Sequence, residues 1–160
     1  MEEKAVAKIK PLKESELFRS LEDKEIALLA KTVEEKNLAA GSPLFYENMT
    51  GEAMYLVASG AIQLSKMLAE GEVKTLTTLG PGDYFGEMAL LEAGPRSVTA
   101  IAAEDSSVLV LRRSEFQRLM AEQPQVAMKI ILAMYRALSD RLRGASPSIQ
   151  QMILARAPAA

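Results

Sequence analysis

The 160-residue sequence contains no histidine, no cysteine and no tryptophan, and only four tyrosines and four phenylalanines. Without cysteine, the chain can form no disulfide, no thiolate nucleophile and no cysteine-bound iron–sulfur cluster. Without histidine, it lacks the commonest general base and the commonest metal ligand. We therefore expect no metal, no other cofactor and no enzymatic activity.

Long apolar runs and a strong charge imbalance are also absent. No run approaches the roughly 20 apolar residues of a membrane-spanning helix. Residues 1–10 alternate charged and small apolar side chains, unlike the apolar core of a secretory signal. The net charge of −2 offers no basic surface for a nucleic acid. We therefore expect a cytoplasmic protein that contacts neither membrane nor nucleic acid.

Short apolar runs do occur, and they are closely spaced between residues 34 and 111. Turn-forming residues such as glycine, proline and asparagine separate these runs, and each run with its turn has the length of one β-strand and one turn. This pattern is typical of a β-sandwich or barrel. The predicted strands are 54–58, 62–68, 73–79, 98–102 and 107–111.

Helical patterns flank this region. Ser20 is the expected N-cap of a helix near the N-terminus, and Ser114 with Gln117 forms an expected capping box after the last strand. Pro124 is expected in the first turn of a long helix that ends near Arg143.

The long helix has two apolar stripes, where one would suffice to pack it against a domain. The first stripe contains Met128, Ile131, Leu132, Tyr135, Leu138 and Leu142, and the second contains Val126, Ile130, Ala133 and Ala137. Two stripes indicate a second buried surface. The alternative is that both lie in the core of one chain.

The segment from Phe85 to Ser97 combines an acid, a base and a short turn. Glu87 and Arg96 lie nine residues apart, and an Ala/Leu-rich run between them can form one helical turn. Free N–H groups at such a turn can bind an anion, and an arginine can donate two hydrogen bonds to a phosphate. Glu87 can accept hydrogen bonds from sugar hydroxyls. The segment therefore predicts a ligand with one phosphate and one ribose.

This segment resembles the phosphate-binding cassette of cyclic nucleotide-binding domains. That family includes the bacterial catabolite activator protein, the regulatory subunits of cAMP-dependent protein kinase, and cyclic nucleotide-gated channels. The matching positions are Gly82, Phe85, Gly86, Glu87, Ala89, Leu90, Pro95, Arg96 and Ser97. The resemblance extends over about residues 17–143. It implies a mainly β, α+β fold: an eight-stranded antiparallel β-roll (a double-stranded β-helix or jelly roll) with N-terminal helices and a long C-terminal helix.

The resemblance also implies a ligand site and its occupant. The ligand-binding residues would be Gly86, Glu87, Met88, Ala89, Leu90, Arg96 and Ser97. Arg141 and Leu142 would contact the base, at positions where the catabolite activator protein has a Thr–Ser pair, and this departure leaves cAMP and cGMP both open. Ser97 directly after the arginine is more similar to cAMP binders, whereas domains selective for cGMP often have threonine there.

In this family the long helix pairs with its twin, so the resemblance implies a homodimer through residues 125–143. We expect a cyclic nucleotide-binding domain over residues 13–143, preceded by an N-terminal segment of residues 1–12. Only 17 residues follow Arg143, with one basic residue among them, so we expect a flexible tail over 144–160 rather than a DNA-binding domain.

The implied function is a sensor that relays cyclic nucleotide binding through its C-terminal helix to an unknown downstream protein. The alternative is a ligand-free β-roll that serves as an interaction module and binds a partner protein.

Overall fold

The computed structural model describes residues 2–145 and 147–156. Within them the strands are β1 (Glu34–Leu38), β2 (Pro43–Phe45), β3 (Thr50–Gly51), β4 (Ala53–Ser59), β5 (Ile62–Met67), β6 (Val73–Leu79), β7 (Tyr84–Phe85), β8 (Gly94–Pro95), β9 (Thr99–Ala102) and β10 (Ser106–Arg112). The α-helices are α1 (Glu2–Glu14), α2 (Asp23–Thr32), α3 (Arg113–Glu122), α4 (Pro124–Gly144) and α5 (Pro147–Arg156), and two 3₁₀ turns are η1 (Glu16–Phe18) and η2 (Glu87–Leu90).

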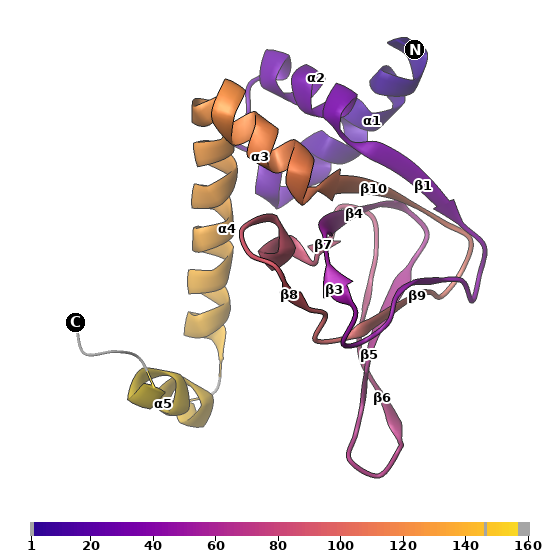
Figure 1. Ribbon diagram of the computed structural model, residues 1–160, viewed down its shortest axis with the longest axis vertical. Coiled ribbons are helices and arrows are strands. Elements are labelled where there is room, and N and C mark those ends of the chain that lie inside the picture. The colour runs from indigo at the N-terminus through magenta and orange to yellow at the C-terminus, as the bar shows by residue number, and fades with distance from the viewer. Residues whose placement is uncertain (1, 146, 157–160) are drawn as a thin grey trace.

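The strands form two four-stranded antiparallel sheets and one two-stranded pair. The sheet orders are β1-β10-β4-β7, β2-β9-β5-β6 and β3-β8. Helices α1, α2 and α3 gather at one end of the strands, α4 runs down one side, and the β5–β6 hairpin projects at the opposite end (Figure 1). This arrangement confirms the predicted antiparallel β-roll with flanking helices, although the described residues form ten strands rather than eight, three of them only two residues long.

Strands β4 and β10 are buried on both faces. Side chains alternate between the two sides of a strand, so neighbouring residues of β4 and β10 enter two different apolar clusters. Val57 and Val108 point into an apolar cluster between the two large sheets. Leu56 and Leu109, their neighbours in the sequence, point into a second cluster shared with the helices. The two cores therefore share the same pair of strands.

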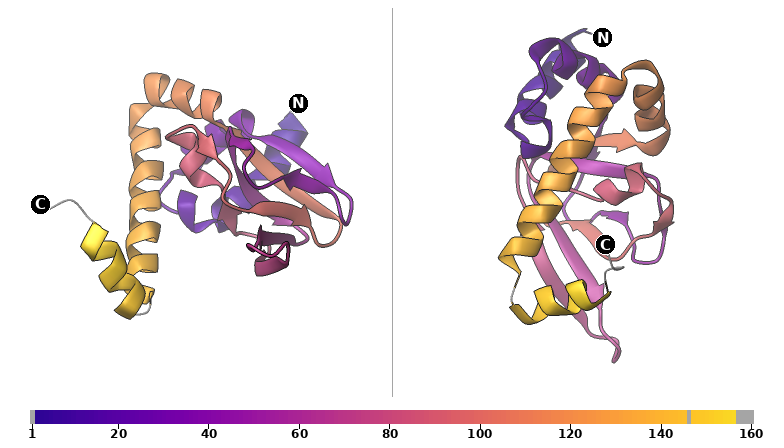
Figure 2. Two further views of the ribbon diagram at one scale, coloured as in Figure 1. Left: turned by 60° about the horizontal axis from the view of Figure 1, so that its bottom comes forward. Right: turned by 90° about the vertical axis from the view of Figure 1, so that its left-hand side faces the viewer.

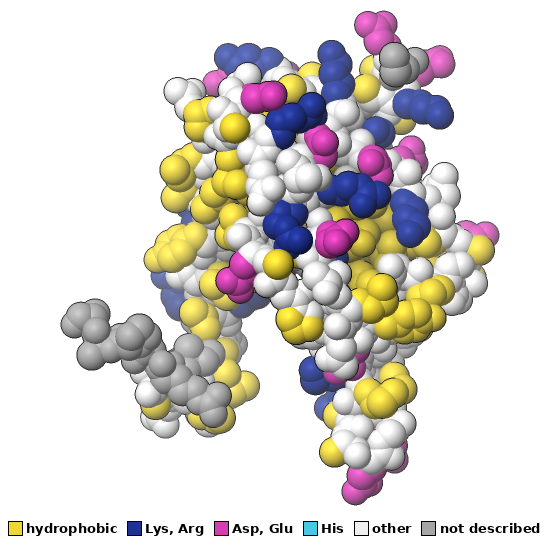
Figure 3. All heavy atoms as spheres, in the orientation of Figure 1, with side chains coloured by type: hydrophobic (Ala, Val, Ile, Leu, Met, Phe, Trp, Pro, Cys, Tyr) yellow, Lys and Arg dark blue, Asp and Glu magenta, His cyan; other side chains and the backbone are white. Residues whose placement is uncertain are grey.

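Helix α4 packs by its second stripe and leaves most of its first stripe exposed, although Ile131 of that stripe is partly buried against the core. Val126 and Ile130 are buried among the helices, whereas Met128, Tyr135 and Leu138 are exposed. The alternative that both stripes lie in the core of one chain is therefore wrong. Figure 2 shows α4 as a long straight rod with α5 at its end, and apolar side chains follow it in Figure 3.

An ion pair fixes the first half of α4 to α2. Lys129 Nζ lies 2.8 Å from Glu25 Oε2, and the carboxylate is almost fully covered. Glu25 also accepts the N–H of Glu22 at 2.7 Å. The lysine hydrogen bond is the main reason that the pKa of Glu25 lies below its ordinary value, with the bond from Glu22 acting in the same direction.

The helix boundaries differ from the predicted ones in four places. Helix α2 is capped by Glu22, in a reciprocal box with Glu25, and not by Ser20. Helix α3 has no side-chain cap, so the expected Ser114 box is absent. Helix α1 runs through the expected boundary at residue 12, and α5 forms within the expected tail. Among the described residues, no helix is both long and apolar enough to cross a membrane.

Candidate functional site

The predicted cassette forms a tight loop between β7 and β9. Gly86 has a φ of 74°, and the four residues after it form the 3₁₀ turn η2. A Cβ atom on Gly86 would lie 2.6 Å from Arg96 Nη1 and 3.3 Å from the Ala53 carbonyl oxygen. Glycine is therefore required here twice, for its positive φ and for the space that Arg96 occupies.

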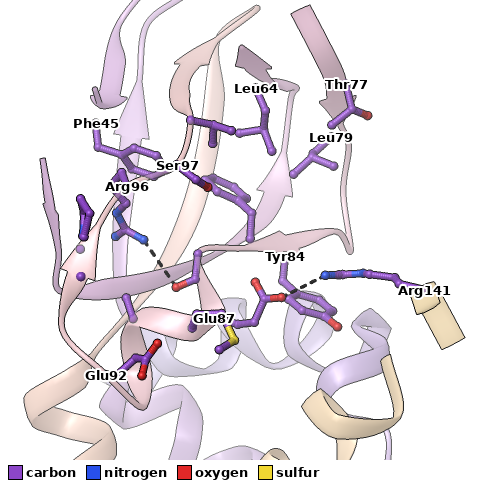
Figure 4. A pocket seen from close by; sticks show the side chains of 18 residues that line it. Phe45, Leu64, Thr77, Leu79, Tyr84, Glu87, Glu92, Arg96, Ser97 and Arg141 are labelled. Atoms are coloured by element: carbon purple, nitrogen blue, oxygen red, sulfur yellow. Dashed lines mark hydrogen bonds and ion pairs between the residues drawn. The ribbon is translucent and has the colours of Figure 1, made fainter. Parts of the chain in front are cut away.

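A pocket of about 650 Å³ opens beside this loop. Most predicted site residues line it, namely Gly86, Glu87, Met88, Ala89, Arg96, Ser97 and Arg141. Figure 4 shows Glu87 and Arg141 on one side of it and Arg96 on the other. Leu90 and Leu142 do not line the pocket. The Leu90 side chain is instead buried in the core beneath the helices.

Arg96 lies at the inner end of the pocket and is only 8% exposed. Its Nη2 donates to the Ala53 carbonyl at 2.6 Å, and its Nη1 donates to the Gly86 carbonyl at 3.5 Å. The guanidinium also lies 4.3 Å from the centre of the Phe45 ring. Burial lowers the pKa of Arg96, yet an arginine remains charged at neutral pH. The site therefore has a preformed, largely desolvated cation.

Glu87 forms an ion pair with the far half of α4. Arg141 Nη1 lies 3.1 Å from Glu87 Oε1, with exposed side-chain fractions of 60% and 17%. The guanidinium also lies 5.8 Å from the centre of the Tyr84 ring. The bond from Arg141 uses Oε1, and no hydrogen bond of Glu87 Oε2 is found among the described residues. The carboxylate therefore joins the cassette to α4 while one oxygen remains available to a ligand.

The remaining cassette groups are less completely arranged for a ligand. The Ala89 N–H donates to the Gly86 carbonyl at 3.2 Å, so an anion would share this donor with the turn. Ser97 is exposed at the pocket, and its carbonyl accepts a bond from Lys66 at 2.9 Å. Met88 is also exposed at the rim.

Several pocket residues were not predicted from the sequence. One wall of the pocket is mostly apolar and is formed by the side chains of Phe45, Leu64, Leu79 and Val98. Thr77 and Tyr84 are the polar members of the same wall. The strands of Leu64, Leu79 and Val98 were predicted from the sequence, whereas β2, which contains Phe45, was not. Nothing in a single sequence marked the hollow face. Among the described residues, no cluster of three histidine, cysteine, aspartate or glutamate side chains could bind a metal ion.

A family model for the cyclic nucleotide-binding domain matches residues 35–123. The chain belongs to this family. Within the family, it is 38% identical over 129 residues to the cyclic AMP receptor protein of Thermus thermophilus, a match that covers 81% of this chain and 60% of that protein. It is also 38% identical over 109 residues to a cAMP-dependent protein kinase regulatory subunit of Aspergillus fumigatus, covering 68% of this chain and 26% of that one.

Solved structures of cyclic nucleotide-binding domains share this fold. The N-terminal domain of a transcriptional regulator from Streptomyces coelicolor superimposes with a TM-score of 0.77 at 30% identity, covering 84% of this chain and 94% of that one. The chain thus matches that single domain over almost its full length, whereas it spans about three fifths of the Thermus receptor. The resemblance inferred from the cassette is confirmed.

Proposed function

We propose that the chain is a cAMP-binding sensor that transmits ligand binding through α4. One observation supports this most: a single pocket brings a buried guanidinium, Arg96, together with the carboxylate of Glu87. A phosphate and a ribose are the groups that this pair would bind. Two of the relatives described above have cyclic AMP in their names.

In this proposal Arg96 pairs with the cyclic phosphate and Glu87 accepts the ribose 2′-hydroxyl through Oε2. Ser97 and the backbone N–H groups of Ala89 and Leu90 complete the phosphate site. The base lies against the apolar wall of the pocket, with Arg141 as its neighbour on α4, whereas Leu142 does not line the pocket. Ser97, in place of threonine, supports cAMP over cGMP.

The relay starts at the Glu87–Arg141 ion pair. A ligand shifts an equilibrium only through its different affinities for two states. A ribose hydroxyl on Glu87 changes the partners of the same carboxylate that contacts α4, so occupancy alters the free energy of that contact. The half of α4 beyond Met134, which is mostly exposed, is the part that would respond.

We also propose that the exposed stripe of α4 pairs with its twin in a homodimer. Tyr135 is 67% exposed and Leu138 is 49% exposed in the single chain, and large apolar patches on a monomer commonly mark an interface. Leu138→Glu should convert a dimer to a monomer in sedimentation, whereas Val6→Glu, at an exposed apolar position on α1, should not. A parent that sediments as a monomer contradicts this part of the proposal.

Calorimetry with cAMP, cGMP and linear AMP tests the ligand assignment. We expect cAMP to bind most tightly and AMP, which lacks the ring and has an additional negative charge, to bind most weakly. The absence of both binding heat and thermal stabilisation with either cyclic nucleotide would instead favour the ligand-free interaction module.

A further inference from the structure

A second arginine contacts the cassette from behind, at the start of α3. Arg113 Nη1 donates to the Gly51 carbonyl at 3.1 Å and to the Ala89 carbonyl at 3.2 Å. The backbone N–H of Arg113 donates to the Glu52 carbonyl at 2.8 Å. The partly buried side chain of Arg113 thus joins η2 to β3, and its backbone joins the β3–β4 connection to the start of α3.

The groups that Arg113 contacts also surround Arg96. A Cβ atom on Gly51 would lie 3.0 Å from Arg96 Cζ and 3.2 Å from Ala89 Cβ. Gly51 therefore lies against the guanidinium of Arg96, while its carbonyl is bonded to Arg113. Burial is the main cause of the lowered pKa of Arg96, and the charge of Arg113 acts in the same direction, which indicates that the two cations are close.

The neighbouring arginine provides a comparison within the same chain. Arg112 pairs instead with Glu34 on β1, at 3.2 Å, and its side chain is half exposed. Neither arginine lines the pocket, but no side-chain hydrogen bond of Arg112 to the cassette is found among the described residues, where its partner is Glu34. The contact with the cassette is therefore specific to Arg113, and it does not result simply from positive charge at the start of α3.

We infer that Arg113 is a positioning residue of the anion-binding half of the pocket. This inference rests on the proposal that the pocket binds a cyclic nucleotide. Its two carbonyl bonds fix the distance between η2 and the Gly51 backbone that supports Arg96. That distance decides whether the phosphate can contact Arg96 and the backbone of η2 together. Because α3 packs directly on α4, the same side chain also connects an occupied cassette to the helices.

The first measurement is the cAMP dissociation constant of Arg113→Gln by calorimetry, with Arg112→Gln as the matched control. Loss of a charge-assisted hydrogen bond predicts a weakening of about tenfold for Arg113→Gln. Arg112→Gln should bind within about twofold of the parent, because an exposed ion pair contributes little. Arg113→Lys keeps the charge on a shorter side chain and should restore part of the affinity.

A second measurement separates positioning of the phosphate site from general destabilisation. In an Arg96→Lys background the phosphate contact is already weakened. Arg113→Gln should therefore reduce the cAMP affinity clearly less in that background than in the parent, because effects in one network are not additive. The preference for cAMP over 2′-deoxy-cAMP, which reports on Glu87, should be unchanged in Arg113→Gln.

Three results would overturn the inference: parent-like affinity in Arg113→Gln, an undiminished loss in the Arg96→Lys background, or an equal loss in Arg112→Gln. A parent that does not bind cAMP would reject the proposed function, and this inference with it.

Discussion

Arg96→Ala should weaken cAMP binding and also destabilise the empty domain. The binding loss follows from removing the only buried cation that lines the pocket among the described residues. A charge-assisted hydrogen bond contributes about 1.5–3 kcal/mol, so the affinity should fall at least about tenfold.

The loss of stability follows from the partners of Arg96 in the empty pocket. Its bond to the Ala53 carbonyl is short, at 2.6 Å, whereas the bond to Gly86, at 3.5 Å, is weak. The contact with the Phe45 ring adds about 0.5–1 kcal/mol. Relief from burying a cation offsets part of this sum. We therefore expect the free energy of unfolding to fall by about 2 kcal/mol, which lowers the melting temperature by about 4–8 °C.

Calorimetry and thermal unfolding without ligand measure the two effects separately. Arg118→Ala is a suitable control, because that arginine is exposed and its ion pair among the described residues is the i,i+3 contact with Glu115. If Arg96→Ala binds cAMP as tightly as the parent does, Arg96 is not the phosphate ligand. An unchanged melting temperature would mean that its carbonyl bonds contribute nothing to the empty state.

Three further predictions concern the sugar contact, the relay and pH. The parent should bind 2′-deoxy-cAMP more weakly than cAMP, and Glu87→Gln should reduce this difference; equal affinity of the parent for both nucleotides would remove Glu87 from the ribose site. Saturating cAMP should change hydrogen exchange in residues 137–145 and in α5, and unchanged protection with the site occupied would mean that the ligand does not act through α4. The pKa of Glu25 is held below its ordinary value of 4.5 mainly by the Lys129 hydrogen bond. Its stabilising effect is therefore complete above that pH and lost as the pH falls through the lowered pKa. Thermal unfolding between about pH 5 and pH 3 should show a smaller loss of stability in Glu25→Gln than in the parent, and equal losses would contradict this role.

The parts of the site that follow one another in the sequence were predictable. Gly86, Glu87 and Arg96 belong to one loop, so their proximity requires no long-range contact. The strand over 73–79 matches β6, because glycines mark both of its ends. These features depend on local chemistry, which a single sequence contains.

Contacts between distant segments were not predictable in this way. The Glu87–Arg141 pair joins residues that are 54 positions apart in the sequence, and the bond from Arg113 to Gly51 joins residues that are 62 positions apart. The resemblance predicted Arg141 as a neighbour of the ligand base, but not as the partner of Glu87, and Arg113 looks in the sequence like an ordinary surface residue of its helix. The cap of α2 shows the same limit on a smaller scale. Ser20 has the side chain that is preferred at an N-cap, but the helix begins after Glu22, whose N–H donates to Glu25 Oε2.

In the proposed relay, the ion pair between Lys129 and Glu25 would act as the pivot about which α4 tilts. Twelve residues separate Lys129 from Arg141, which corresponds to an arm of about 18 Å along a helix. A rotation of only about 10° at the pivot would move Arg141 by about 3 Å over that arm. A displacement of that size separates the 3.1 Å contact with Glu87. In the proposed relay, a small change in the tilt of α4 would therefore be sufficient to separate Arg141 from Glu87.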